Sequence, residues 1–317
     1  MWFCARSEAL ISKFNAAWVV CLLMLALLIA SRPSDFASDY TVYEENFSKI
    51  VSGEVVGVEF GYQLLSLLSE ALGLGFFGVL FLYAFIALYY KFKFLVSISE
   101  LTAANVIFFV VLYSVVFFPL WELTQMRNAA AVAVSCVALT SQTKSRSLFL
   151  FLFGAMLHNV AVIIFLMWLV YTYFYSLRYV SILIGAVLLY FIIGLMPYFS
   201  IYSADVYDQS YNPLSFKTLY ILATFVFVLL HPQRIAKGFA FYSFAFLALY
   251  LSMGQMPAAA VRIVDVALFF SIVSLGLIQG KFTMIYKFVT MIALGYVYIK
   301  IAFFADSPLL NVQSLLG

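Results

Sequence analysis

Long apolar runs, separated by short polar stretches, constrain this chain more than any other feature of its sequence. Runs of about 15 to 20 residues recur from Ala16–Ala30 onward, the length that a helix needs to cross a bilayer. Hydrophobic residues make up 66% of the chain and charged residues 10%. A backbone in lipid must satisfy its own hydrogen bonds, so the spans are expected to be helices. We therefore expect an all-α, polytopic membrane helical bundle of about 10–11 transmembrane segments, with residues 1–317 forming one membrane domain.

Charge and cysteine usage exclude several other classes of protein. The net charge of +3 comes from loop Lys and Arg, which indicates membrane topology, and we expect no nucleic-acid partner. The three cysteines, Cys4, Cys21 and Cys136, are widely spaced and predict neither a disulfide framework nor a metal site. The first apolar run resembles a signal peptide, but further spans follow, so we expect it to be a retained helix.

The segment Ser147–Ser176 is ambiguous because its 30 mostly apolar residues are too many for one span and few for two. One uninterrupted span divides the 17 Lys and Arg residues 9 to 8 between the two faces, whereas a break near His158 with a returning chain divides them 11 to 6. Basic residues favour the cytoplasmic face, so the broken hairpin is the preferred interpretation and the single span the alternative. Broken helices are tolerated at membrane depth where they line a protein-enclosed cavity.

This topology places the N-terminus in the cytoplasm and two loops outside, at about residues 31–58 and 200–217. The ionisable residues that then lie on the outer side or in the outer half of the membrane include Asp39, Glu59, Arg127, His158, Arg262 and the loop with Asp205 and Asp208. There is no P-loop and no room for a cytoplasmic nucleotide-binding domain. A reaction at the outer face would therefore use an activated donor delivered through the membrane.

Each of these candidates has a functional and a structural interpretation. Arg127 and Arg262 offer a planar fork of donors that suits phosphate oxygens; each could instead be an interfacial arginine or pair with a carboxylate such as Glu122 or Asp265. His158 could contact phosphate or carry a proton, or could be a neutral imidazole at a helix break. A metal site is not expected, because the two histidines, His158 and His231, fall on opposite faces.

Acids and tyrosines of the first outer loop complete the candidate set. Asp39 and Glu59 are candidates for a general base that deprotonates a sugar hydroxyl, although acidic loops are usually solvated surfaces. Tyrosines of this region could stack on sugars or belong to the aromatic belt of the membrane interface; these are Tyr40, Tyr43 and Tyr62.

An ordered set of short motifs resembles the EpsG-like group of Wzy-type polysaccharide polymerases. The motifs are Asp39-Tyr40-x2-Tyr43, Glu59-x-Gly61-Tyr62, Arg127-Asn128-x2-Ala131, Ala155-x2-His158 and Arg262-Ile263. Each motif is short, so the specificity lies in the order of the set, within which the Arg127 to His158 block is the most informative.

The resemblance implies a metal-independent, cofactor-free glycosyltransferase of the bacterial inner membrane with a GT-C-like fold. Such an enzyme joins undecaprenyl-pyrophosphate-linked repeat units of O-antigen or exopolysaccharide at the periplasmic face, and a chain-length regulator is a possible partner. Arg127 and Arg262 would hold the leaving pyrophosphate, and His158 would assist there or carry a proton. Glu59 or Asp39 would act on the acceptor hydroxyl. The expected substrate contacts are Asn128, Tyr40, Tyr43 and Tyr62.

Two other functions use similar components. An O-antigen ligase would transfer the same lipid-linked donor to lipid A core, but usually has a larger outer loop than the 18 residues at 200–217. A transporter or flippase would show charges in both leaflets and two repeated halves with broken helices. Here the charged set is one-sided and no repeat is visible, so polymerisation is the preferred function.

Overall fold

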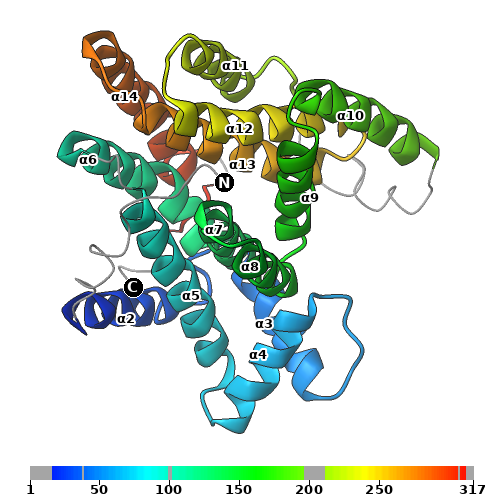
Figure 1. Ribbon diagram of the computed structural model, residues 1–317. Coiled ribbons are helices and arrows are strands. Elements are labelled where there is room, and N and C mark those ends of the chain that lie inside the picture. The colour runs from blue at the N-terminus through cyan, green and yellow to red at the C-terminus, as the bar shows by residue number, and fades with distance from the viewer. Residues whose placement is uncertain (1–15, 38, 99–101, 196–210, 306–307, 312–317) are drawn as a thin grey trace. The chain divides into compact units, whose positions relative to one another are not determined.

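The computed structural model describes residues 16–37, 39–98, 102–195, 211–305 and 308–311, and Figure 1 shows their arrangement. Within these ranges the chain is helical apart from turns and a single isolated bridge. The elements are α2 (Ala16–Ala30), α3 (Tyr40–Val51), α4 (Phe60–Ala71), α5 (Gly75–Ser97), α6 (Ala103–Leu112), η1 (Tyr113–Glu122), α7 (Met126–Thr140), α8 (Lys144–Leu157), α9 (Val160–Tyr173), α10 (Arg178–Leu195), α11 (Phe216–Leu229), α12 (Arg234–Ser252), α13 (Pro257–Gly276) and α14 (Lys281–Phe303).

The helices confirm a multi-pass, all-α membrane protein. Five are long and apolar enough to cross a membrane: α5, α6 continued by η1, α12, α13 and α14. Further apolar helices of 10–17 residues accompany them among the described residues. Their exposed sides carry large hydrophobic side chains, as expected of surfaces that face lipid.

The chain divides into two compact units. Unit 1 contains residues 1–165 and 288–317, and unit 2 contains residues 166–287. The single membrane domain expected from the sequence stays a prediction.

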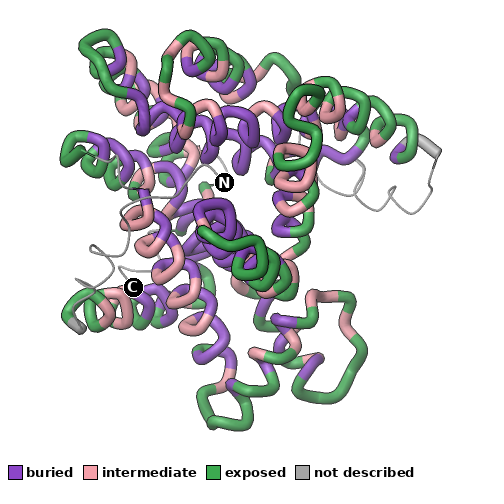
Figure 2. The backbone as a smooth tube through the Cα atoms, viewed as in Figure 1, coloured by how far each residue is buried: buried purple, intermediate pink, exposed green. Residues whose placement is uncertain are grey.

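Helix α7 forms the centre of unit 1, between α5 and α8 (Figure 1). It is buried along nearly its whole length (Figure 2), because its small residues, such as Ala129, Ala130 and Ala131, let neighbouring helices approach closely. The Ser97 hydroxyl at the end of α5 donates to the Thr140 hydroxyl at the end of α7 at 3.0 Å. The ends of α5 and α7 therefore lie side by side.

The chain reverses direction at His158. Helix α8 ends immediately before His158, and α9 begins two residues after it. The rings of Phe151 and Phe165, seven residues to either side, lie with centroids 5.4 Å apart, whereas a continuous helix would separate them by about 21 Å. A Cβ added to Gly154 would lie 3.0 Å from the Ala161 methyl group, so the two arms touch. The broken hairpin is confirmed, and the single span is excluded.

Two local features could not be read from the apolar runs. The helix that begins at Ala103 continues through Pro119 as a π-helix to Glu122, because a local π-type adjustment of the backbone compensates for the hydrogen bond that proline cannot make. The predicted outer loop at 31–58 contains α3, whose buried residues Tyr43, Phe47 and Ile50 follow the spacing of one helical face. Of the second predicted loop, 200–217, residues 200–210 lie outside the described part.

Unit 2 is built around α12 and α13. The Ser243 hydroxyl of α12 donates to the Ala267 carbonyl of α13 at 2.9 Å, and Phe239 and Phe270 stack across the same contact. Lys217 of α11 donates to the buried carboxylate of Asp265 at 2.7 Å.

Candidate functional site

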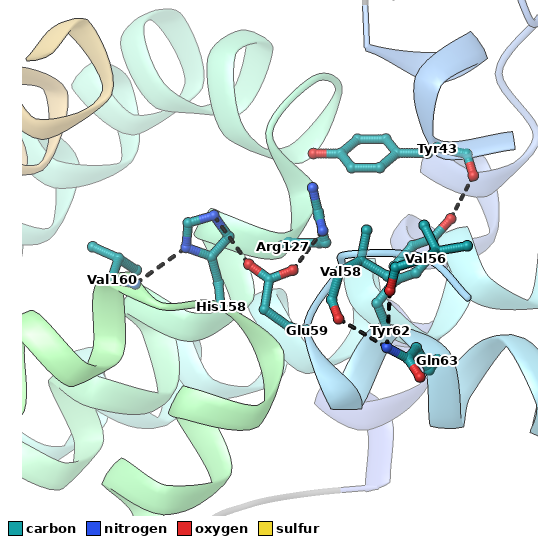
Figure 3. Close-up of polar contacts among 9 residues, drawn as sticks. All are labelled: Tyr43, Val56, Val58, Glu59, Tyr62, Gln63, Arg127, His158 and Val160. Atoms are coloured by element: carbon teal, nitrogen blue, oxygen red, sulfur yellow. Dashed lines mark hydrogen bonds and ion pairs between the residues drawn. The ribbon is translucent and has the colours of Figure 1, made fainter. Parts of the chain in front are cut away.

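A carboxylate held between two basic side chains is the main polar feature of unit 1 (Figure 3). The Arg127 Nη1 donates to Glu59 Oε2 at 2.5 Å, and the His158 Nε2 lies 3.7 Å from Glu59 Oε1. Only 16%, 11% and 22% of the Arg127, Glu59 and His158 side chains are exposed. Three segments distant in sequence thus meet at one partly buried carboxylate: the residue before α4, the first turn of α7 and the break between α8 and α9.

The helix break orients the imidazole of His158. The residue has an extended backbone (φ −167°, ψ 144°), and its Nδ1 accepts a hydrogen bond from the Val160 amide at 3.2 Å. A neutral imidazole that accepts at Nδ1 carries its proton on Nε2. The Nε2–H group therefore faces Glu59 as a donor, which leaves the carboxylate as the proton acceptor of the cluster.

Two tyrosine rings lie beside the Arg127 guanidinium. Its Cζ lies 5.0 Å from the centroid of the Tyr43 ring and 5.4 Å from that of the Tyr62 ring, within the range of cation–π attraction. The Tyr62 hydroxyl donates to the Tyr43 carbonyl at 2.6 Å, which ties α4 to α3. These rings restrict the guanidinium to the side on which Glu59 lies.

The motif set that suggested a family is therefore largely assembled in space, and a family model matches the chain from residue 15 to residue 314 as EpsG family. The chain belongs to the EpsG family. EpsG is a family of Wzy-like polysaccharide polymerases, so this chain is, at family level, a polymerase of that kind. Neither a curated protein nor a solved structure matches the chain.

Gly61 allows two helix backbones to come into close contact at this EpsG-family site. A Cβ added at Gly61 would lie 2.4 Å from the Met156 carbonyl oxygen and 2.8 Å from the carbonyl carbon. The backbones of α4 and α8 therefore approach more closely than any residue with a side chain would allow. Because Glu59 lies two residues before Gly61 and His158 two residues after Met156, this contact brings the carboxylate to the imidazole.

We expect Gly61→Ala to separate α4 from α8 and to reduce polymer formation by about 10²-fold, the effect of a displacement of about 1 Å in a catalytic group. The Met156 carbonyl belongs to the helix backbone and cannot move aside like a flexible side chain. Polymer length and amount in cells with matched levels of the protein would measure the effect. The control is Gly57→Ala, because a Cβ at Gly57 meets nothing within 4 Å. Normal polymer from Gly61→Ala would contradict this account of the site.

Not every predicted residue joins the cluster. Asp39 precedes α3, is half-buried and makes no side-chain cap. Asn128 Nδ2 donates to Gln125 Oε1 at 3.3 Å, next to Arg127 in sequence. Tyr40 lies against Phe76, with ring centroids 5.1 Å apart, and faces another arginine described below. Arg262 is exposed on α13 in unit 2, so its role stays a prediction.

The alternative partners considered for the arginines are bound elsewhere. Glu122 accepts hydrogen bonds from the Lys91 ammonium and the Tyr113 hydroxyl inside unit 1, and Asp265 accepts one from Lys217. Arg127 pairs with Glu59, which neither alternative anticipated. Sequence reasoning also missed Lys91 as a buried charge, although its position inside the span of α5 was a signal for one.

The described residues contain no group of three or more His, Cys, Asp and Glu side chains close enough to hold a metal ion. The side chains gathered at Glu59 are the Arg127 guanidinium, the His158 imidazole and the rings of Tyr43 and Tyr62 beside the guanidinium.

Proposed function

We propose that this chain joins oligosaccharide repeat units linked to undecaprenyl pyrophosphate, at the periplasmic face of the bacterial inner membrane, to make O-antigen or exopolysaccharide. The observation that carries the proposal is the Glu59 carboxylate between the Arg127 guanidinium and the His158 Nε2–H. Transfer of a sugar from a phosphate-linked donor to a hydroxyl requires a group that accepts the hydroxyl proton and hydrogen-bond donors beside it. Glu59 can supply the first, and Arg127 and His158 the second.

In the proposed reaction the hydroxyl at the non-reducing end of one repeat unit attacks the anomeric carbon of the growing chain. The new bond joins the hydroxyl oxygen to that carbon, and the bond from the carbon to the pyrophosphate oxygen breaks. Glu59 takes the hydroxyl proton, and undecaprenyl pyrophosphate leaves with the bonding electrons. The His158 Nε2–H, which faces Glu59, holds this carboxylate in position for the proton transfer.

The geometry favours Glu59 over Asp39 as the base. Glu59 is held by two partners in a partly buried position, whereas the Asp39 carboxylate makes no cap to the helix it precedes. Arg127 orients the carboxylate through the hydrogen bond from its Nη1. The tyrosine rings at Tyr43 and Tyr62 are proposed to restrict the approach of a sugar, and Asn128 to donate to it from the same turn of α7. A metal-independent mechanism with no cofactor belongs to this proposal.

The test is the surface polysaccharide of a deletion strain complemented with wild type, Arg127→Ala or His158→Ala, at matched membrane levels of the protein. We expect both variants to lose the long ladder on a gel while single repeat units still reach lipid A core. Orienting and proton-transfer groups each contribute about 10²–10⁴-fold to rate, enough to remove long chains. Arg146→Ala, which removes an exposed arginine of α8, is the control.

Other results would point to other functions. Loss of every capped species, with lipid-linked polymer accumulating, would indicate an O-antigen ligase. An unchanged ladder in both variants would contradict the proposal and favour transport of the lipid-linked glycan.

A further inference from the structure

Arg32, in the turn between α2 and α3, is a buried cation that the proposed mechanism does not use. Only 7% of the residue is exposed. Its Nη1 donates to the Ile29 carbonyl at 2.9 Å, whereas Nε and Nη2 are buried and make no hydrogen bond. Among the residues that the structure describes, no carboxylate forms an ion pair with it. Burial lowers the pKa of this guanidinium, and an unpaired buried charge destabilises the empty protein.

The Arg32 guanidinium lies on the same face of α3 as that of Arg127. Its Cζ lies 5.7 Å from the Tyr40 ring centroid, and the Arg127 Cζ lies 5.0 Å from the Tyr43 ring centroid. Residues three apart on a helix are neighbours on one face. The Tyr43 hydroxyl interacts electrostatically with both guanidiniums. The two arginines therefore flank one pair of tyrosines.

The turn that holds Arg32 is fixed by hydrophobic packing on either side of it and by a backbone hydrogen bond. Ile29 and Phe36, on either side of Arg32 in sequence, belong to one hydrophobic cluster with Leu123, which lies in the link between η1 and α7. The Asn311 amide donates to the Phe36 carbonyl at 2.9 Å. The turn that holds Arg32 is thus packed against the link that leads into α7, the helix that begins with Met126 and Arg127.

Arg127 and Arg32 differ in whether a carboxylate is paired with them. Glu59 already neutralises Arg127, whereas Arg32 forms no ion pair among the described residues and is attracted by Glu122 only from beyond ion-pair distance. Its two free nitrogens, Nε and Nη2, form one edge of the guanidinium, and such an edge binds two phosphate oxygens at once. We propose that Arg32 binds the diphosphate of the lipid-linked sugar, as a specificity-determining residue of the site at Glu59; this rests on the proposed function.

The test is ligand binding by the purified full-length protein in detergent, followed by thermal unfolding and titration with geranylgeranyl diphosphate. We expect Arg32→Met to weaken binding by at least about tenfold, the effect of losing a charge-assisted, two-point contact. We also expect its unfolding temperature without ligand to be higher than that of wild type, because an unpaired buried charge has been removed. Arg146→Met, which removes an exposed arginine, should match wild type in both respects.

The probes distinguish the sources of the anion. Inorganic pyrophosphate should compete with geranylgeranyl diphosphate, and dioleoylphosphatidylglycerol should not. Competition by phosphatidylglycerol alone would assign Arg32 to a bilayer lipid and overturn the proposal. Arg32→Lys keeps the charge but removes the two-nitrogen edge, so an affinity between those of wild type and Arg32→Met is expected. It serves as the binding variant if Arg32→Met does not fold.

Wild-type affinity in Arg32→Met and Arg32→Lys, or no binding of the diphosphate by wild type, would overturn the inference. A lower unfolding temperature with unchanged affinity would show that Arg32 is only structural. Glu59→Gln separates this inference from the proposed function, because it should bind the diphosphate and make no polymer. If Glu59→Gln makes normal polymer while Arg32→Met loses diphosphate binding, the proposed function fails and the role of Arg32 stands.

Discussion

Glu59→Gln is expected to reduce polymer formation by about 10²–10⁴-fold, the usual contribution of a general base. Glutamine keeps the size of the side chain and an oxygen that accepts from Arg127, so the hydrogen bond now present at 2.5 Å can persist. Its amide cannot take a proton from the acceptor hydroxyl. The rate of chain growth should therefore fall by more than the loss of stability from the unneutralised Arg127 charge explains.

The rate of polymer growth on lipid-linked repeat units in membranes measures this prediction, with thermal unfolding in detergent to confirm the fold. The control is Glu54→Gln, because Glu54 is exposed near the start of the same loop and its carboxylate accepts only from the Ser52 hydroxyl at 3.2 Å. A Glu59→Gln protein that polymerises at the wild-type rate would exclude Glu59 as the base.

Lys91→Met is expected to destabilise unit 1 by about 3–5 kcal/mol, the cost of removing one partner from a buried ion pair. The Glu122 side chain is fully buried and the Lys91 side chain is 11% exposed. Without the ammonium, Glu122 would keep only the Tyr113 hydroxyl as a donor. One oxygen of Glu122, Oε2, already makes no hydrogen bond, and among the described residues Lys91 is the one cation that forms an ion pair with this carboxylate.

Thermal unfolding of the purified variant measures the loss, and the double variant Lys91→Met/Glu122→Gln should recover most of it, because no unpaired charge remains. Lys93→Met is the control, since Lys93 lies two residues further along α5 and is only partly buried. Equal unfolding temperatures for Lys91→Met and wild type would show that Glu122 is not held as an ion.

Lys91 shows that the rule placing basic residues on the cytoplasmic side can give the right chain path and still miss a buried ion pair. Counting Lys91 among the cytoplasmic basic residues gave a topology in which the chain breaks near His158, and that break is present. The count assigns each Lys or Arg only to the cytoplasmic or the outer face of the membrane. It carries no information about a lysine that reaches into the core to Glu122, because that contact depends on how η1 continues past Pro119.

The outer segment at 31–58 gives a second example. Its acids and tyrosines indicated a loop with candidate bases, yet residues 40–51 form α3, which packs Tyr43, Phe47 and Ile50 inward. The helical spacing of these residues was visible in the sequence. The sequence did not show which side chain lies next to each tyrosine. The most important of these contacts is the one between Arg32 and Tyr40, because it led to the proposed role of Arg32.

The sequence by itself determined that this is a multi-pass helical membrane protein of the EpsG family with a break at His158. Apolar run length, the sign of loop charges and the order of short motifs are properties of the chain in one dimension, so they can be read directly. Only the tertiary structure decided that Glu59 joins Arg127 to His158 and that two guanidinium nitrogens of Arg32 are buried without a hydrogen bond among the described residues. The contact between Glu59 and His158 depends on the close approach of α4 to α8 at Gly61 and on the reversal of the chain after α8, since only a folded backbone brings groups so far apart in sequence next to each other.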